Sequence, residues 1–264
     1  MSVSSIFSTV ISGIKTVTTV PTIVTLKIFD KIKRTVYTIP RGNKIDTKDL
    51  QPGDVLLVNV EDGFFSWSNV TREFICAGQA VNPHLTKGHS TTVHAAIYAG
   101  SSREKRDRYA EVGDRCIAEA VGEGLKIETF PLKNEHDTYF VFRSKSPQIA
   151  QKAAEIAKDC VLKRGQLPGY GDYTKWGAIC SITSYAPLSS GDFLKKAESL
   201  SKNYPKEFFC SGFVVFCYTL AALNFKESAD KFILLDHEST TPMQLEHYLR
   251  THENNWTFVG RVET

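Results

Sequence analysis

A cysteine at the start of a long apolar segment is the first candidate for chemistry. Cys210 is followed by Ser211, Gly212 and a nearly uninterrupted apolar run to Leu223. The run predicts a buried helix at 211–223, which places Cys210 at the helix N-terminus. There, unpaired backbone N–H groups and the positive end of the helix dipole favour a thiolate and can stabilise an oxyanion. Cys210 is therefore a candidate nucleophile for acyl chemistry; the plain alternative is a core cysteine.

Two polar side chains inside apolar strands are the candidate partners of this cysteine. A nucleophilic cysteine needs a base, usually histidine, and a third group that orients the base. Among seven histidines, His94 lies within the predicted strand 93–99, and Glu119 lies alone within the predicted strand 116–121. Burying either group unpaired costs free energy. A hydrogen bond from His94 to Glu119 would satisfy both, although His94 could also be an ordinary partnered core histidine.

The elements that must position these side chains follow from periodicity and turn residues. The segment from Gln166 to Leu188 is expected to be a long loop with a short helix. Because the strands come in a group and do not alternate with helices, the sequence favours an α+β fold. The other expected elements are strands at 54–60, 138–143 and 256–262 and helices at 67–79, 147–163 and 193–201, with a further helix starting at Thr241–Pro242.

The N-terminal segment 1–47 differs in composition from the predicted domain at 48–264. Apolar residues at 3, 6, 7, 10, 11, 14 and 17 share one helix face, and basic residues follow between 27 and 41. Positive charge would precede the apolar run in a signal peptide, so we expect none. The segment could contact a membrane surface through residues 3–41. A helix packed on the domain and a mobile leader are the alternatives.

Composition excludes several classes of protein. The 264-residue chain has 32 Lys and Arg against 29 Asp and Glu, a net charge of +3, which does not indicate a nucleic-acid-binding protein. Its six cysteines are scattered, and several lie in apolar runs, so we interpret them as reduced thiols in a cytoplasmic setting. His84, His89 and His94 are spaced by five, which suits no metal site. The glycines match no phosphate-binding loop. We expect no metal or other cofactor.

The order of these residues resembles a known enzyme family. Residues 210–214 resemble the nucleophile motif of NlpC-type cysteine amidases, although there the cysteine usually precedes the histidine. The reversed order resembles the permuted papain-fold branch, the YiiX-like amidases. Matching features over about residues 50–250 are Pro52–Val55, the strand from His94 to Gly100, Glu119–Ala120 and Thr241–Pro242. Gly212 is similar to the unpermuted enzymes, whereas many YiiX-like members carry an acidic residue soon after the cysteine.

The resemblance implies a fold and roles for individual residues. The implied fold is a circularly permuted papain-like domain, in which a small antiparallel β-barrel or sheet packs on the helix that carries the nucleophile. Cys210 would be the nucleophile, His94 the general base and acid, and Glu119 the residue that orients His94. The family usually has a tyrosine near the oxyanion upstream of the cysteine, and both Tyr170 and Tyr173 are candidates.

The leading prediction for function is a cysteine hydrolase that cleaves an amide bond, in a peptide or an N-acyl compound, through a thioester on Cys210. One alternative is a lipid-directed acyltransferase or thioesterase similar to lecithin:retinol acyltransferase, which the apolar leader and its basic flank would suit. Another is a catalytically silent binding module that uses the same cleft. The sequence leaves the oligomeric state open.

Overall fold

The computed structural model describes residues 42–59, 92–101, 114–130, 138–164, 166, 170–173, 188–202, 205–227 and 231–264. These residues belong to a compact unit that runs from Thr38 to Thr264. The predicted N-terminal helix, the predicted helix at 67–79, and His84 and His89 lie outside the described residues.

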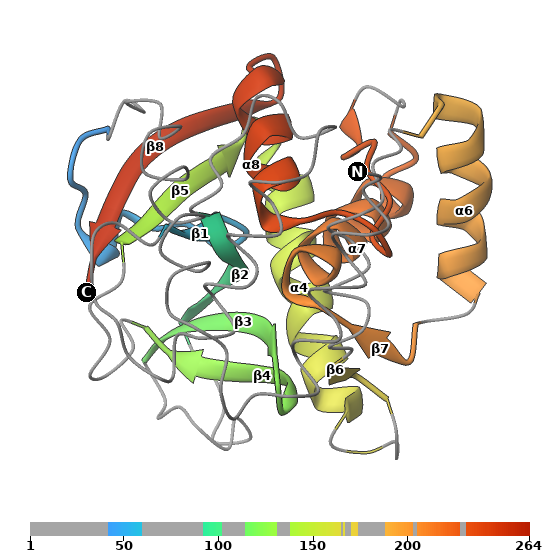
Figure 1. The fold of residues 1–264 in the computed structure, drawn as a ribbon, viewed down its shortest axis with the longest axis horizontal. Helices are drawn as coiled ribbons and strands as arrows, with labels where there is room; N and C mark the ends of the chain where they lie inside the picture. The colour runs from blue at the N-terminus through green and yellow to red at the C-terminus, as the bar shows by residue number, and fades with distance from the viewer. Residues whose placement is uncertain are drawn as a thin grey trace, which may run out of the picture. The chain divides into compact units, whose positions relative to one another are not determined.

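A six-stranded sheet and a set of helices make up the described part of the chain (Figure 1). The sheet has the strand order β4-β3-β2-β1-β5-β8, and every neighbouring pair is antiparallel. A short parallel pair, β6 with β7, is separate from it. The strands are β1 (Val55–Asn59), β2 (Thr92–Ser101), β3 (Arg115–Val121), β4 (Gly124–Thr129), β5 (Thr138–Ser144), β6 (Asp172–Tyr173), β7 (Glu207–Phe208) and β8 (Trp256–Glu263). The helices are the 3-10 turn η1 (Thr47–Asp49), α4 (Pro147–Arg164), α6 (Ser190–Lys202), α7 (Cys210–Asn224) and α8 (Pro242–Thr251).

Both faces of the sheet are buried, and the central strand β1 shows this most clearly. All five of its residues are buried. Val55 and Leu57 belong to the larger hydrophobic core with the helices, whereas Leu56 and Val58 belong to a smaller core that also contains Tyr139. Alternate side chains of a strand point to opposite faces. A strand that is apolar at every position therefore suits a sheet covered on both sides.

Helix α7 lies at the centre of the larger core. It contacts β2 and β3 on one side and α4, α6 and α8 on others, and it is visible between the sheet and α6 in Figure 1. Every residue from Cys210 to Ala222 is buried. A helix that is apolar all round has to be buried all round. The apolar run thus fixes the helix in the interior, with its first residue, Cys210, beside the sheet.

The region that opens β1 is packed too closely for larger residues. Gly53 has a positive φ of 91°, and a Cβ there would lie 2.2 Å from the carbonyl oxygen of Ala150 in α4. The Gly53 carbonyl accepts a hydrogen bond from the Tyr218 hydroxyl of α7. Arg143 binds Asp54 through two hydrogen bonds of 2.8 and 2.7 Å. These contacts join β1 and β5 to the two helices that pack on the sheet.

The expected α+β class is confirmed, and most expected elements are present. Three strands were not predicted: the two-residue strands β6 and β7, and β4, which pairs with β3 along its whole length. Residues 43–45 also pair with Arg261 of β8, so ordered packing begins before the predicted boundary at residue 48. Over the described residues the strand order is that of an open sheet, and no closed barrel is recorded. No helix of the described part is long and apolar enough to cross a membrane.

Candidate active site

The structure brings Cys210, His94 and Glu119 together from three elements. Cys210 is the first residue of α7, His94 lies in β2, and Glu119 lies in β3. Glu119 is opposite Ala96 in the β2–β3 pairing, and His94 is two residues before Ala96 on the same side of the strand. Such diagonal neighbours are within reach of long side chains. The ring nitrogen Nε2 of the half-buried His94 lies 2.6 Å from Oε2 of the buried Glu119, as the sequence predicts.

The other ring nitrogen of His94 is available to exchange a proton with Cys210. His94 and Cys210 lie near enough for each to shift the pKa of the other. Since Nε2 of His94 contacts Glu119, Nδ1 is the ring nitrogen left for the thiol. The result is a chain of three groups, in which a carboxylate orients an imidazole and the imidazole exchanges a proton with sulfur. This is the arrangement that activates a nucleophilic cysteine.

The charges around His94 and Cys210 outweigh burial and favour the ionised form of each group. Burial alone would lower the pKa of His94, but the Cys210 thiolate and the Glu119 carboxylate raise it to about 10. Burial would likewise raise the pKa of the Cys210 thiol, but the His94 imidazolium and the backbone N–H groups of Ala95 and Ser211 bring it below its ordinary value. These opposite shifts favour a thiolate–imidazolium pair over a neutral thiol beside a neutral imidazole.

The first turn of α7 contributes to this electrostatic environment. The N-cap residue, Phe209, has an extended backbone and makes no side-chain capping bond. A helix N-terminus carries about half a positive charge on its leading N–H groups. One of these, the N–H of Ser211, faces the Cys210 sulfur. The residue that follows Cys210 thus stabilises the thiolate through its backbone N–H, which every residue type except proline can supply.

Gly212 is explained by a close approach of the chain. A Cβ at this position would lie 2.2 Å from the carbonyl oxygen of His237, which no real Cβ tolerates. Beside it, the Ser211 hydroxyl donates a 2.6 Å hydrogen bond to the carbonyl of Thr240. The segment 236–241 is therefore packed directly on the first turn of α7. His237 in this segment is buried, with 6% exposure.

Tyr170 is not placed as an oxyanion donor. Its hydroxyl donates to Sγ of Cys160 at 3.5 Å, and its ring packs against Phe208. The Cys160 thiol is in turn hydrogen-bonded to that of Cys217, which is about 10 Å along α7 from Cys210. An oxyanion donor has to lie about 3 Å from the oxyanion. The Tyr170 hydroxyl instead has a partner in the core, as a buried phenol requires. The side chain of Tyr173 lies outside the described residues.

A residue that the sequence analysis did not single out, Lys126, also reaches the site. Its Nζ lies 3.4 Å from Oε1 of Glu119 and 2.7 Å from Glu128. The signal was present in the sequence: from Leu125 to Glu128, apolar and charged residues alternate directly after a Gly-Glu-Gly turn. That pattern is typical of the second strand of a hairpin. It would have placed Lys126 on the same strand face as Glu128.

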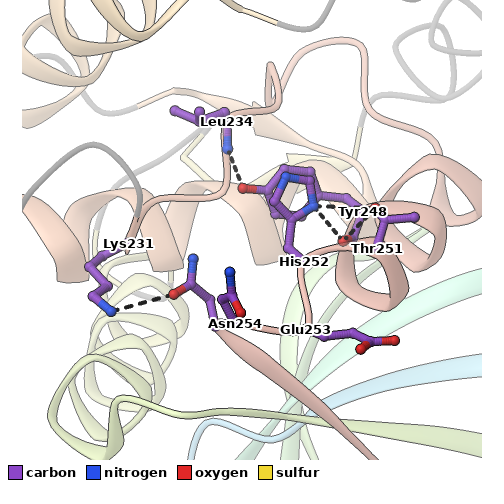
Figure 2. Close-up of a pocket in the computed structure, with 8 residues that line it drawn as sticks. Lys231, Leu234, Tyr248, Thr251, His252, Glu253 and Asn254 are labelled. Carbon is purple, nitrogen blue, oxygen red and sulfur yellow. Dashed lines mark hydrogen bonds between the residues drawn. The ribbon is translucent and has the colours of Figure 1, made fainter.

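A separate hollow lies at the C-terminal end of α8 (Figure 2). It encloses about 610 Å³, and the rings of Tyr248 and His252 stack in it with centroids 3.7 Å apart. Cys210, His94 and Glu119 do not line this hollow. Its lining residues are Lys231, Leu234, Tyr248, Thr251, His252, Glu253, Asn254 and Asn255.

Within the described ranges, no three His, Cys, Asp or Glu side chains are grouped to hold a metal ion. No family model, curated protein or solved structure matches this chain.

Proposed function

We propose that the protein is a cysteine hydrolase that cleaves an amide bond through a thioester on Cys210. The observation that carries the proposal is the 2.6 Å hydrogen bond between His94 and Glu119, made beside a thiol at a helix N-terminus. A merely structural histidine would not need both a buried carboxylate and a cysteine as partners. The three groups together suit proton transfer at sulfur.

The reaction follows from the positions of the protons. The Cys210 thiolate attacks the carbonyl carbon, and the α7 N-terminus stabilises the negative charge that develops on oxygen. His94, protonated at the nitrogen facing the sulfur, gives that proton to the leaving amine as the C–N bond breaks. Water then attacks the thioester while His94 removes its proton, and the C–S bond breaks to release a carboxylic acid. Glu119 keeps the ring oriented in both steps.

The order of elements supports a further proposal, that the domain is a circularly permuted papain-like fold. The histidine and glutamate strands, β2 and β3, precede the nucleophile helix α7 in the chain. An antiparallel sheet packed on that helix is also what the resemblance implies. The described cysteines Cys116, Cys160, Cys210 and Cys217 are free thiols, which supports a reducing, cytoplasmic setting. Membrane contact through residues 3–41 and a lipid substrate stay predictions, because that segment lies outside the described residues.

Trapping the thioester tests the proposed function. We would incubate the protein with p-nitrophenyl esters and with peptide and N-acyl p-nitroanilides, then locate any acyl group by mass spectrometry. Acylation is expected at Cys210, reversible by hydroxylamine and lost in Cys210→Ser. Cys116→Ser, which removes another buried thiol, serves as the matched control and should behave like the unmodified protein. Turnover that persists in Cys210→Ser, or the absence of acylation at Cys210 with every substrate, would contradict the proposal.

A further inference from the structure

We propose that Lys126 is a positioning residue that keeps the Glu119 carboxylate ionised and turned toward His94. The inference rests on the proposed function for its catalytic meaning, although the electrostatic role stands on the geometry alone. Lys126 does not touch His94 or Cys210 in any recorded contact of the described residues, so it would act through Glu119.

The hairpin of β3 and β4 sets the distance between the two side chains. Glu119 and Lys126 are direct cross-strand partners, so their side chains leave the same face of the sheet. The Lys126 ammonium lies 3.4 Å from Oε1 of Glu119, while Oε2 is bound to His94. Each carboxylate oxygen therefore has its own cationic or hydrogen-bonding partner. A carboxylate held at both oxygens cannot rotate without breaking one of these contacts.

Glu119 needs this support because it is almost completely enclosed. Its side chain is only 4% exposed, and burial raises the pKa of a carboxyl group. His94 and then Lys126 oppose that effect and bring the Glu119 pKa below its ordinary value. Without Lys126, the imidazolium of His94 would be the main opposing charge. Protonation of Glu119 at mildly acidic pH would then remove the acceptor that orients His94.

Lys126 also links Glu119 to a second side chain. Glu128, on the same face of β4 as Lys126, lies beside Glu119 and lowers its pKa through a hydrogen bond. Lys126 binds Glu128 at 2.7 Å and so bridges the two glutamates. His94 faces Glu119 from β2, and Cys210 of α7 is coupled to it through His94. Glu128 helps to keep the Lys126 pKa above its ordinary value, so the lysine stays charged throughout the neutral range.

The test measures the titration of Glu119 and the reactivity of Cys210 separately. The Glu119 carboxyl is followed by carbon NMR between pH 3 and 8, and the alkylation rate of Cys210 by iodoacetamide is followed by mass spectrometry over the same range. An opposite charge within 4–6 Å shifts a carboxyl pKa by about 1–3 units. Because Lys126 is about one-fifth exposed, we expect the low end of that range. Lys126→Met should raise the Glu119 pKa, and the acidic limb of Cys210 alkylation, by about one unit.

Matched variants test whether the positive charge of Lys126 causes these shifts. Lys126→Arg should keep both the Glu119 titration and the Cys210 alkylation profile of the unmodified protein. Lys126→Gln should have the same effect as Lys126→Met, and it replaces that variant if the methionine protein folds poorly. Lys152→Met, which breaks the exposed pair with Glu155 on α4, should change neither. In a Glu119→Gln background, Lys126→Met should no longer move the alkylation profile.

Each outcome bears on one claim. Profiles of Lys126→Met and Lys126→Gln that superimpose on those of the unmodified protein would overturn the inference, as would a shift that persists in the Glu119→Gln background. If the Glu119 titration moves as expected while Cys210 alkylates as an ordinary thiol, the role of Lys126 stands and the proposed function fails. If Cys210 is activated but Glu119 titrates identically with and without Lys126, the proposed function stands and the role of Lys126 fails.

Discussion

Replacing Glu119 by glutamine should lower the pKa of His94 by about three units. The substitution keeps the shape of the side chain and removes its charge, so the imidazolium loses the carboxylate that lies 2.6 Å from its Nε2. Removing a negative neighbour disfavours the protonated ring, and the pKa therefore falls.

The magnitude follows from Coulomb's law. Two unit charges about 4 Å apart interact by about 4 kcal/mol at an effective dielectric constant of about 20. One pKa unit corresponds to about 1.4 kcal/mol, so the loss is equivalent to about three units. The His94 pKa should move from about 10 to about 7. The basic limb of Cys210 alkylation should move with it, because the imidazolium stabilises the thiolate.

The assay is an NMR titration of the imidazole carbon resonances, with His94 assigned through their loss in His94→Gln. Glu123→Gln is the matched control, since Glu123 is an exposed glutamate in the turn of the same hairpin. It should leave His94 unchanged. A His94 pKa in Glu119→Gln that stays within half a unit of the unmodified value would refute the electrostatic reasoning.

Two further predictions concern stability. Gly212→Ala should destabilise the protein by about 2 kcal/mol, because its Cβ would meet the His237 carbonyl oxygen at 2.2 Å. Gly191→Ala, where nothing lies within 4 Å, should be neutral or stabilising by up to about 1 kcal/mol; equal urea denaturation midpoints for the two variants would contradict this. Burial and then Lys196 lower the His237 pKa to about 4. The unfolded chain therefore takes up this proton first as the pH falls, and the folded protein should lose about 3 kcal/mol between pH 6.5 and 4. His237→Asn should remove that loss from the urea unfolding free energy measured across this range, and an unchanged pH dependence would exclude His237 as its source.

The grouping of the candidate site residues could be predicted because each is anomalous in its own segment. His94 and Glu119 are single polar residues in apolar strands, and Cys210 opens an apolar run. Burying such groups without partners costs free energy, so the simplest interpretation is that they contact one another. Each residue stands out in its local sequence, and the structure joins the three across three elements.

Other features depended on packing that no local pattern reveals. His237 is flanked by charged residues, and its burial arises because its backbone fits against Gly212 of α7. Tyr170 lies at the right point of the chain for an oxyanion donor, but its hydroxyl is turned to Cys160 of α4. Both outcomes are set by contacts between segments distant in sequence.

The strand β4 was missed for a different reason. Its alternation of apolar and charged residues is short, and a short alternation is a weaker signal than a long apolar run. Missing the strand also meant missing Lys126, since its relation to Glu119 exists only through the β3–β4 register.

Activation of Cys210 by His94 is the central claim, and cysteine-resolved alkylation tests it most directly. The folded protein would be treated with iodoacetamide between pH 5 and 9, and the rate at each of the six cysteines would be quantified by mass spectrometry. We predict that Cys210 reacts far faster than the others, remains reactive below pH 7, and loses this advantage in His94→Ala. A Cys210 that reacts no faster than the buried Cys116 and Cys217, with the same profile in His94→Ala, would contradict the account.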